Sequence, residues 1–519
     1  MSTHHGPREA LVAIMGTTGT GKSDLAVDLA VRFNGEIINA DAMQMYKGLP
    51  IITNQISAEE QRGVPHHLLA TVDIDLQPWT VGVFAREATR LIREIRSRGK
   101  LPIVVGGTHY YISSLLFANT LVDPPEEDGE STYMSQFDIE QQHPILNGPT
   151  DLILKRLTEV DPVMAARWHP DDRRKIRRSL EIFLTTGRKA SDIYEDQQKA
   201  KAASTPTDRP WHALMFWVYS NPDVLKARLD KRVDKMELNG LMNEVRQLHE
   251  NLSFRKAAGE EVDRTRGIWQ SIGFKQFEPF LIAEGNGATT EDLSKLKAES
   301  MELTKIATRQ YARYQLRWLR TKTIPELREN NATKLLFALD SSETPKFVDN
   351  VLSPAANITQ AYLDGLDLPD PASVSTTARD IFSTFVGADQ PKKTNYEPKL
   401  CDVCNMTLQT PDQWTKHVNG QRHRRGLKHR SRTTLVAIHW PEEESGQRRN
   451  LHAPSGPGSG ILRGLFTNHL RICWHSIALP TSMLSALKTL FSGKTNMFPM
   501  ASASPIQSIA PSSAGNTAI

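Results

Sequence analysis

Apolar residues follow two spacings in the first part of the chain, and these predict strands and helices in alternation. Short runs rich in apolar residues at Leu11–Met15, Glu36–Asn39 and Leu101–Val105 are typical of buried strands. Apolar residues at helical spacing over Ser23–Phe33 and Val83–Arg98 predict helices between them. Strands that alternate with helices indicate an α/β fold built on a parallel sheet.

The spacing changes beyond this region and predicts a separate helical segment. An acidic, proline-containing stretch is followed by helical spacing around Leu152–Val160 and Arg173–Thr185. A strand expected at Ala213–Val218 then returns the chain to the sheet. The expected division is a core of residues 9–122 and 210–365 and a helical insertion of residues 123–209.

The C-terminal part of the chain divides into three segments of different character. A stretch rich in Pro, Ser, Thr and Asp at residues 366–395 is typical of a linker. A small module with cysteines and histidines occupies residues 396–432. Residues 433–519 show no clear periodicity, so we assign them no fold and expect a disordered tail. The sequence leaves open whether this tail is an artefact of gene prediction.

The composition is that of an ordinary globular protein. The 519 residues are 39% hydrophobic and 24% charged, and a net charge of only +4 does not identify a partner. Three cysteines in so long a chain argue against a disulfide framework and for a reducing compartment. The sequence has no run of apolar residues long enough to span a bilayer and no secretory signal. We expect a monomer in the cytosol, without membrane attachment, and leave mitochondrial import open.

A glycine-rich segment after the first expected strand has the spacing of a phosphate-binding loop. It consists of Gly16, Thr17, Thr18, Gly19, Thr20, Gly21, Lys22 and Ser23. Backbone N–H groups of such a loop, and of the helix that follows it, bind phosphate oxygens, and glycines allow a close approach. Lys22 would add a positive charge, and Ser23 would be a ligand for a Mg²⁺ ion that shields a diphosphate.

A loop of this kind does not by itself identify the reaction. Most proteins that carry one hydrolyse nucleoside triphosphates or transfer phosphoryl groups, which usually requires a second acidic Mg²⁺ ligand. Here the strand that ends at Val105 is followed by Gly106 and Gly107 and not by an acid. This difference weakens the nucleotide-hydrolysis hypothesis and favours another use of a bound diphosphate.

Asp41 closely follows the second expected strand. Ligands of a doubly wound sheet bind beyond the carboxyl ends of the strands, which places Asp41 beside the phosphate-binding loop. Its carboxylate could take a proton from an amine nucleophile while a diphosphate leaves. An aspartate that caps a helix or a turn is an alternative that position alone leaves open.

Several motifs in order resemble those of the tRNA dimethylallyltransferases, also called tRNA isopentenyltransferases. The likeness runs, with gaps, from about Leu11 to Arg320. Besides the phosphate-binding loop, the motifs include Asp41-Ala42-Met43-Gln44-Met45-Tyr46, Val105-Gly106-Gly107-Thr108-His109-Tyr110-Tyr111, Arg177-Arg178-Ser179-Leu180-Glu181 and Thr308-Arg309-Gln310-Tyr311-Ala312-Arg313. The resemblance implies a P-loop NTPase-like fold and transfer of dimethylallyl from dimethylallyl diphosphate to N6 of the adenosine immediately 3′ of the anticodon.

The resemblance also implies roles for individual residues. Asp41 would be the general base, Arg232 would clamp the diphosphate together with the loop, and Ser23 would hold Mg²⁺, so these three form the expected catalytic set. The implied tRNA contacts are Asp41, Ala42, Met43, Gln44, Thr108, Arg174, Lys175, Ile176, Arg177, Arg178, Gln270, Ser271, Ile272, Gly273, Phe274 and Lys275. For the basic residues between 173 and 178, a solvated helix face is the alternative.

Two cysteines and two histidines near the C-terminus have the spacing of a tetrahedral Zn²⁺ site. Cys401, Cys404, His417 and His423 are separated by two, twelve and five residues. A module this short needs the metal in order to fold. Eukaryotic members of the family resemble this chain in carrying such a C-terminal finger. The surrounding basic residues, which favour RNA, are Lys416, Arg422, Arg424, Arg425, Lys428, Arg430 and Arg432.

Alternatives to these hypotheses remain open from the sequence alone. The finger could be structural or bind protein, and its basic cluster is also a candidate nuclear import signal. A P-loop kinase or NTPase would turn over ATP without a prenyl donor. A non-catalytic RNA-binding adaptor would tolerate the loss of Lys22 or Asp41. The combination of motifs favours the transferase acting on a tRNA anticodon stem-loop over both rivals.

Overall fold

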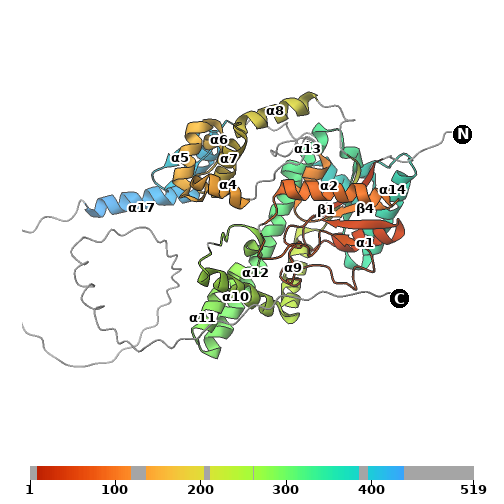
Figure 1. The fold of residues 1–519 in the computed structure, drawn as a ribbon, viewed down its shortest axis with the longest axis horizontal. Coiled ribbons are helices and arrows are strands. Elements are labelled where there is room, and N and C mark those ends of the chain that lie inside the picture. The colour runs from red at the N-terminus through yellow and green to blue at the C-terminus, as the bar shows by residue number, and fades with distance from the viewer. Residues whose placement is uncertain are drawn as a thin grey trace, which may run out of the picture. The chain divides into compact units, whose positions relative to one another are not determined.

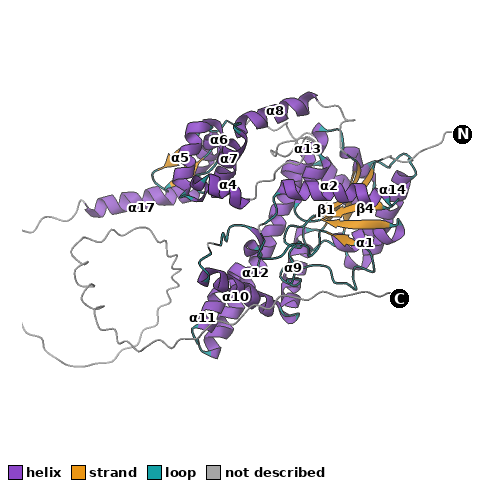
Figure 2. Ribbon diagram, viewed as in Figure 1, coloured by secondary structure: helices purple, strands orange, loops and turns teal. Residues whose placement is uncertain are grey.

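A parallel sheet of six strands is the central layer of the α/β core (Figures 1 and 2). Residue Val12 pairs with Ile103 on one side and with Leu214 on the other, so the strand that precedes the phosphate-binding loop is central. The strands, in spatial order, are β3 (His66–His67), β2 (Gly35–Asn39), β4 (Leu101–Val105), β1 (Ala10–Gly16), β5 (His212–Tyr219) and β6 (Leu336–Asp340). The predicted α/β fold with a parallel sheet is confirmed, although the sequence pattern did not predict β3 and β6.

This computed structural model describes only part of the chain. The described residues are 9–76, 78–117, 136–203, 211–260, 262–384 and 395–437. They belong to one unit of the chain, which ends at Trp440. The acidic start of the predicted insertion and the expected tail from residue 438 onward lie outside the described residues. Within the described residues, no helix combines the length and the apolar character that crossing a membrane requires.

Successive side chains of the strands other than β3 enter two hydrophobic cores, one on each face of the sheet. Leu11 and Met15 of β1 belong to the core that contains α2 (Val81–Ser97) and α3 (His109–Leu116). Val12 and Ile14 belong to the opposite core, with α1 (Lys22–Arg32) and α14 (Ser353–Leu363). Burial on both faces explains why the strands are nearly continuous apolar runs.

Helices that follow β5 extend the core beyond the sheet. They are α9 (Pro222–Leu238), α10 (Leu241–Ala257), α11 (Phe274–Gly285), α12 (Thr290–Trp318) and α13 (Ile324–Glu329). The long helix α12 packs against both α9 and α11. Its C-terminal part reaches the phosphate-binding loop, where Gln315 hydrogen-bonds to Thr18. The site is therefore held between the sheet and this helical part.

The described part of the predicted insertion is helical and has a core of its own. Ile153, Leu157, Ile176 and Leu180 are fully buried within it. Its helices are α4 (Gln136–Gln142), α5 (Thr150–Val160), α6 (Pro162–Arg167), α7 (Arg173–Thr186) and α8 (Ala190–Ala203), which group together in Figure 1. Asp161 caps α6 by accepting the N–H of Met164 at 3.1 Å.

The prediction of a linker at residues 366–395 is wrong for its first half, which is folded. Pro371–Ser373 form a 3-10 turn, and α15 (Thr376–Ser383) follows it. Ala378 and Ile381 are buried in the core that also contains α2, and the hydroxyl of Thr377 donates a hydrogen bond to Asp340 at 2.6 Å. The polar composition of this stretch reflects a helix with only one buried face. The core therefore continues beyond its expected end at residue 365.

The Cys/His module folds as two strands followed by two helices. Strands β7 (Lys399–Cys401) and β8 (Met406–Leu408) pair in antiparallel fashion, and helices α16 (Pro411–Val418) and α17 (Gln421–Ala437) follow. The helix α17 continues to Ala437, beyond the expected boundary at residue 432.

Candidate active site and nucleic-acid interface

The phosphate-binding loop joins β1 to α1 in a conformation that requires glycine. Gly16, Gly19 and Gly21 have φ angles of 147°, 87° and 87°. A Cβ atom at Gly16 would lie 2.4 Å from the carbonyl oxygen of Val218, and one at Gly21 would lie 2.7 Å from the ring of Phe347. The loop is therefore restricted both by its own backbone and by the strand and ring packed against it.

Lys22, at the start of α1, holds its ammonium group inside this loop. Its Nζ donates a hydrogen bond to the Thr17 carbonyl at 2.7 Å. Desolvation lowers the pKa of Lys22 to about 8; the Asp41 carboxylate opposes this shift and Arg232 adds to it. An anion bound in the loop would favour the charged form of Lys22.

Arg232 of α9 reaches the same loop from another part of the chain. Its Nη1 donates a hydrogen bond to the hydroxyl of Thr18 at 2.7 Å. Burial lowers the pKa of Arg232, while the nearby Asp24 carboxylate raises it. The structure thus brings together Lys22 and Arg232, two cations that repel each other in the free protein. Such an arrangement is characteristic of an anion site.

Asp41 lies in the turn that follows β2, where several groups orient it. Its N–H donates to the Asn39 side chain at 3.1 Å, and its Oδ1 accepts the N–H of Met43 at 3.2 Å. Desolvation raises the pKa of Asp41, although Lys22 and hydrogen bonds from backbone N–H groups lower it. The turn-capping alternative therefore describes part of its structural role. The raised pKa is in addition the property expected of a general base.

A pocket of about 990 Å³ joins the loop, Asp41 and Arg232. Apolar side chains of Ile51, Ile56, Met236 and Phe347 also line it. Further cations on its wall are Arg228, Lys231 and Lys235. The sequence analysis did not single these out, although their spacing with Arg232 places all four on one face of α9. The pocket thus combines a cationic end with apolar wall, as a ligand with a charged head and a hydrocarbon tail requires.

Of the predicted tRNA contacts in this region, Asp41 and Gln44 line the pocket, whereas Ala42, Met43 and Thr108 do not. The N–H of Ala42 donates to the Thr108 hydroxyl at 3.0 Å, which joins the turn after β2 to the turn after β4. Gln44 lines the pocket with Asp41, and its side chain donates to the Asn54 carbonyl at 2.8 Å. Two motifs that are far apart in the sequence therefore form one wall.

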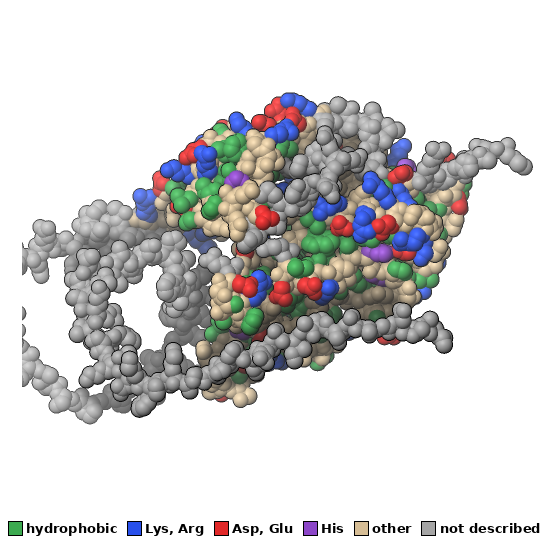
Figure 3. Space-filling view, in the orientation of Figure 1, with side chains coloured by type: hydrophobic (Ala, Val, Ile, Leu, Met, Phe, Trp, Pro, Cys, Tyr) green, Lys and Arg blue, Asp and Glu red, His purple; other side chains and the backbone are tan. Residues whose placement is uncertain are grey.

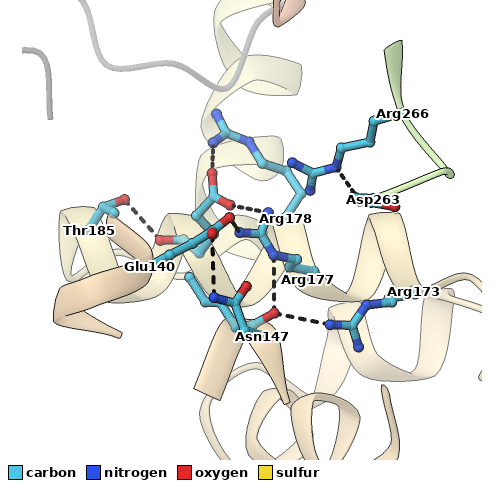
Figure 4. Close-up of polar contacts among 10 residues, drawn as sticks. Glu140, Asn147, Arg173, Arg177, Arg178, Thr185, Asp263 and Arg266 are labelled. Atoms are coloured by element: carbon cyan, nitrogen blue, oxygen red, sulfur yellow. Dashed lines mark hydrogen bonds and ion pairs between the residues drawn. The ribbon is translucent and has the colours of Figure 1, made fainter. Parts of the chain in front are cut away.

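The predicted tRNA segment 174–178 in α7 presents only some of its side chains to solvent. Arg174, Lys175 and Arg178 are exposed, whereas Ile176 is fully buried and Arg177 is only 4% exposed. Arg177 donates to Glu140 at 2.6 Å, to Glu181 at 3.1 Å and to the Leu146 carbonyl at 3.1 Å (Figure 4). The side chains of Ile176 and Arg177 are thus enclosed within the insertion, and a tRNA contact at these two positions stays a prediction.

The second predicted tRNA segment, residues 270–275, likewise exposes only some of its side chains. Gln270 and Lys275 are exposed and Ile272 is half-buried. Ser271, Gly273 and Phe274 are buried at the start of α11, where the N–H of Gly273 donates to Gln276 at 2.8 Å. Packing against the core thus leaves the side chains of Gln270, Ile272 and Lys275 accessible to solvent.

The four side chains predicted as zinc ligands converge in the finger. Their ligand atoms all lie within 4.8 Å of one another. Nδ1 of His423 is 3.4 Å from Sγ of Cys401 and 3.8 Å from Sγ of Cys404. Nε2 of His417 is buried without a hydrogen-bond partner, which is costly for a polar atom unless a metal ion uses it. Two thiolates and two imidazoles are a typical ligand set for tetrahedral Zn²⁺.

The finger also contacts the insertion, a relationship that the sequence analysis missed. Nε2 of His169 lies 3.2 Å from the Thr407 carbonyl oxygen. The guanidinium group of Arg167 lies over the rings of Tyr194 and Tyr396, at 5.1 Å and 5.8 Å from their centroids.

On the face shown in Figure 3, basic and acidic side chains are interspersed, in keeping with the small net charge.

Comparisons with known proteins identify two families that match this chain. The IPP transferase family matches residues 44–322, and a zinc-finger family of C2H2 type matches residues 399–423. The tRNA dimethylallyltransferases of Homo sapiens and Schizosaccharomyces pombe are each 36% identical to this chain. These alignments cover 86% and 80% of this chain and 92% and 94% of the two relatives.

A solved structure extends the agreement to three dimensions. A eukaryotic dimethylallyltransferase acting on tRNA superimposes with a TM-score of 0.67 at 32% identity, over 83% of this chain and 99% of that one. Because sequence and structure both match over most of the chain, it belongs to the tRNA dimethylallyltransferase family.

Proposed function

We propose that this protein transfers a dimethylallyl group from dimethylallyl diphosphate to N6 of the adenosine immediately 3′ of a tRNA anticodon. One observation carries the proposal: Asp41 shares a pocket with Lys22 and Arg232. A base and a diphosphate site are thereby available to the same reacting groups. The relatives that carry this activity in their names support the choice of donor and acceptor.

In the proposed reaction, the adenosine N6 attacks the allylic carbon while the carbon–oxygen bond to diphosphate breaks. The bonding electron pair leaves with the diphosphate, and Asp41 accepts the proton from the amino group. An allylic carbon tolerates cationic character, so the protein mainly has to stabilise the departing charge and hold the reactants together. Lys22 and Arg232 supply that stabilisation from two sides of the loop.

The acceptor base has to leave its stack to reach the pocket, as base-modifying enzymes generally require. Gln44, half-buried on the pocket wall beside Asp41, is positioned to bind an edge of the extruded base. The exposed Arg174, Lys175 and Arg178 of the insertion would contact phosphates of the anticodon stem-loop. The basic side chains of α16 and α17 would extend that contact, with Zn²⁺ holding the finger in its folded form.

Magnesium is the second metal in the proposal. Ser23 and Asp24 line the pocket beside the loop, and hydroxyl and carboxylate oxygens are the ligands that Mg²⁺ prefers. Burial, and then repulsion by Glu60, raise the pKa of Asp24, although Arg232 lowers it. A bound cation would reduce that repulsion, so these residues fit Mg²⁺, which would shield the diphosphate charge.

A kinase or NTPase function is disfavoured by the geometry after β4. The second acidic Mg²⁺ ligand of such enzymes would be expected at this strand end. A Cβ atom at Gly106 would lie 2.2 Å from the backbone of Ala40, and one at Gly107 would lie 2.4 Å from the Gln315 side chain. Neither position can hold an acidic side chain without displacing its neighbours.

The test combines purified protein, Mg²⁺, unmodified tRNA and labelled dimethylallyl diphosphate. We expect the wild-type protein to transfer label to tRNA, and Asp41→Asn to lower the rate about 100-fold or more while tRNA binding is retained. Asp367→Asn, a change of an exposed aspartate, is the matched control. The proposal would be overturned if the wild-type protein transferred no label to tRNA. It would also be overturned if Asp41→Asn transferred label at the wild-type rate.

A further inference from the structure

Gln315 of α12 is a buried amide that joins two loops of the site. Gln315 is only 2% exposed to solvent. Its Oε1 accepts the N–H of Thr18 in the phosphate-binding loop at 2.9 Å. Its Nε2 donates to the carbonyl of Gly107, in the turn after β4, at 3.0 Å. The amide therefore spans the gap between the two loops.

The turn at Gly107 lies directly against Asp41. A Cβ atom at Gly107 would be 2.4 Å from Nε2 of Gln315 and 3.0 Å from Oδ2 of Asp41. A backbone hydrogen bond from Gly107 also lowers the pKa of Asp41. A side chain at this position would have to displace the Gln315 amide, because the amide and the carboxylate both approach the backbone of Gly107. A displacement of Gln315 would thus change the surroundings of the base.

Thr18, the other residue that the Gln315 amide contacts, is also held by hydrogen bonds. Thr18 is held at its N–H by Gln315 and at its hydroxyl by Arg232, the latter at 2.7 Å. One N–H of the phosphate-binding loop is therefore used by the protein itself. Tyr311, one turn earlier on α12, hydrogen-bonds to Gln315 and to Thr108. These contacts fix the orientation of the amide, because a buried amide without its partners would be unfavourable.

We propose that Gln315 is a positioning residue, whose amide sets the distance between the diphosphate-binding loop and Asp41. The inference rests on the proposed function. Gln315 does not belong to the residues that line the pocket, so it acts through Thr18 and Gly107 and not on a substrate. Transfer requires the allylic carbon, held by its diphosphate, to lie about 3–3.5 Å from the attacking nitrogen. A misplacement of about 1 Å can lower a rate about 100-fold.

Two substitutions separate positioning from stability. Gln315→Glu keeps an acceptor for the Thr18 N–H but replaces the donor to Gly107 with a negative oxygen. Gln315→Met has nearly the same length and removes both hydrogen bonds. Thr304→Val, on the same helix, is the matched control, because Thr304 is also buried but its hydroxyl donates a hydrogen bond to the backbone carbonyl of Ser300 and not to either loop.

The measurements are the thermal midpoint, kcat, and KM for each substrate in the full-length protein. We expect both Gln315 variants to have a lower thermal midpoint than Thr304→Val, because they leave buried polar groups unpaired or bury a charge. At a temperature where all variants are folded, both should lose at least about tenfold in kcat, with KM for tRNA close to that of Thr304→Val. Folded Gln315 variants with the kcat of the control would overturn this inference alone. A kcat loss that only follows the folded fraction would do the same. Failure of the wild-type protein to transfer would overturn the proposed function and this inference with it.

Discussion

Arg232 donates a hydrogen bond to the hydroxyl of Thr18 at 2.7 Å and thereby joins α9 to the phosphate-binding loop. Lys22 lies in the same loop, 2.7 Å from the Thr17 carbonyl. Burial lowers the pKa of both cations, so their charged forms are less stable here than in water and a bound anion would stabilise them. A ligand with more than one negative charge, such as a diphosphate, would compensate both.

Replacement of Arg232 should weaken use of the donor. We expect Arg232→Met to lower kcat/KM for dimethylallyl diphosphate about 10- to 100-fold, because hydrogen bonds to charged groups contribute about 1.5–3 kcal/mol. Arg232→Lys should be intermediate, since it retains the charge but not the planar guanidinium. Steady-state kinetics at saturating tRNA provide the measurement. A loss no larger than that of Lys226→Met, an exposed cation of the same helix, would contradict the assignment.

Lys22 should produce an alkaline limb in the pH profile. Its pKa is lowered to about 8, so the free protein loses this positive charge as the pH rises through that value. We therefore expect kcat/KM for the donor to fall above about pH 8, whereas kcat, which reports the bound complex, should fall less. Lys22→Arg should move this limb to higher pH. A profile that is unchanged by Lys22→Arg would show that another group titrates.

Asp41 should produce an acidic limb. A general base has to be deprotonated, and burial raises the pKa of Asp41 above that of an ordinary aspartate. The transfer rate should therefore fall as the pH decreases through this raised value, at higher pH than for an exposed carboxylate. Single-turnover rates across the acidic range measure the limb. A limb at the pKa of an ordinary aspartate would contradict the raised value.

Arg177 and Arg174 should behave differently although they are three residues apart. Arg177→Met removes the buried arginine that pairs with both Glu140 and Glu181, and we expect it to lower the free energy of unfolding by about 3–5 kcal/mol. Arg174→Met should change stability little but weaken tRNA binding and reduce its salt dependence. Thermal unfolding and tRNA titrations at several salt concentrations test both. Equal effects of the two substitutions on unfolding would argue against the buried role of Arg177.

Loss of zinc should affect binding more than chemistry. Cys404→Ser, chelation of the metal, or deletion of residues 396–432 should unfold or remove the finger, because Zn²⁺ binding contributes to its folding. We expect weaker tRNA binding and a nearly unchanged transfer rate at saturating tRNA. Metal analysis together with tRNA titrations gives the result. Unaltered affinity for tRNA would exclude the role assigned to the finger.

Elements with a strong local pattern were predicted well. The expected strand Leu11–Met15 and helix Ser23–Phe33 correspond closely to β1 and α1. The strand β3 was missed because it has only two residues and exists through its pairing with β2. The helix α15 was assigned to a linker because its polar residues outnumber the few, including Ala378, that contact the core. Short or one-sided elements depend on partners that local spacing does not reveal.

The sequence by itself determined the chemistry that is available. The glycines, Lys22 and Ser23 of the loop, and the four finger ligands, are recognisable because their function depends on fixed local spacing. Only the tertiary structure decided which groups meet and which are enclosed. It places Gln315 against Thr18, 297 residues away, and buries Arg177 among carboxylates. Such contacts depend on how distant segments pack, and spacing within one segment carries no information about that packing.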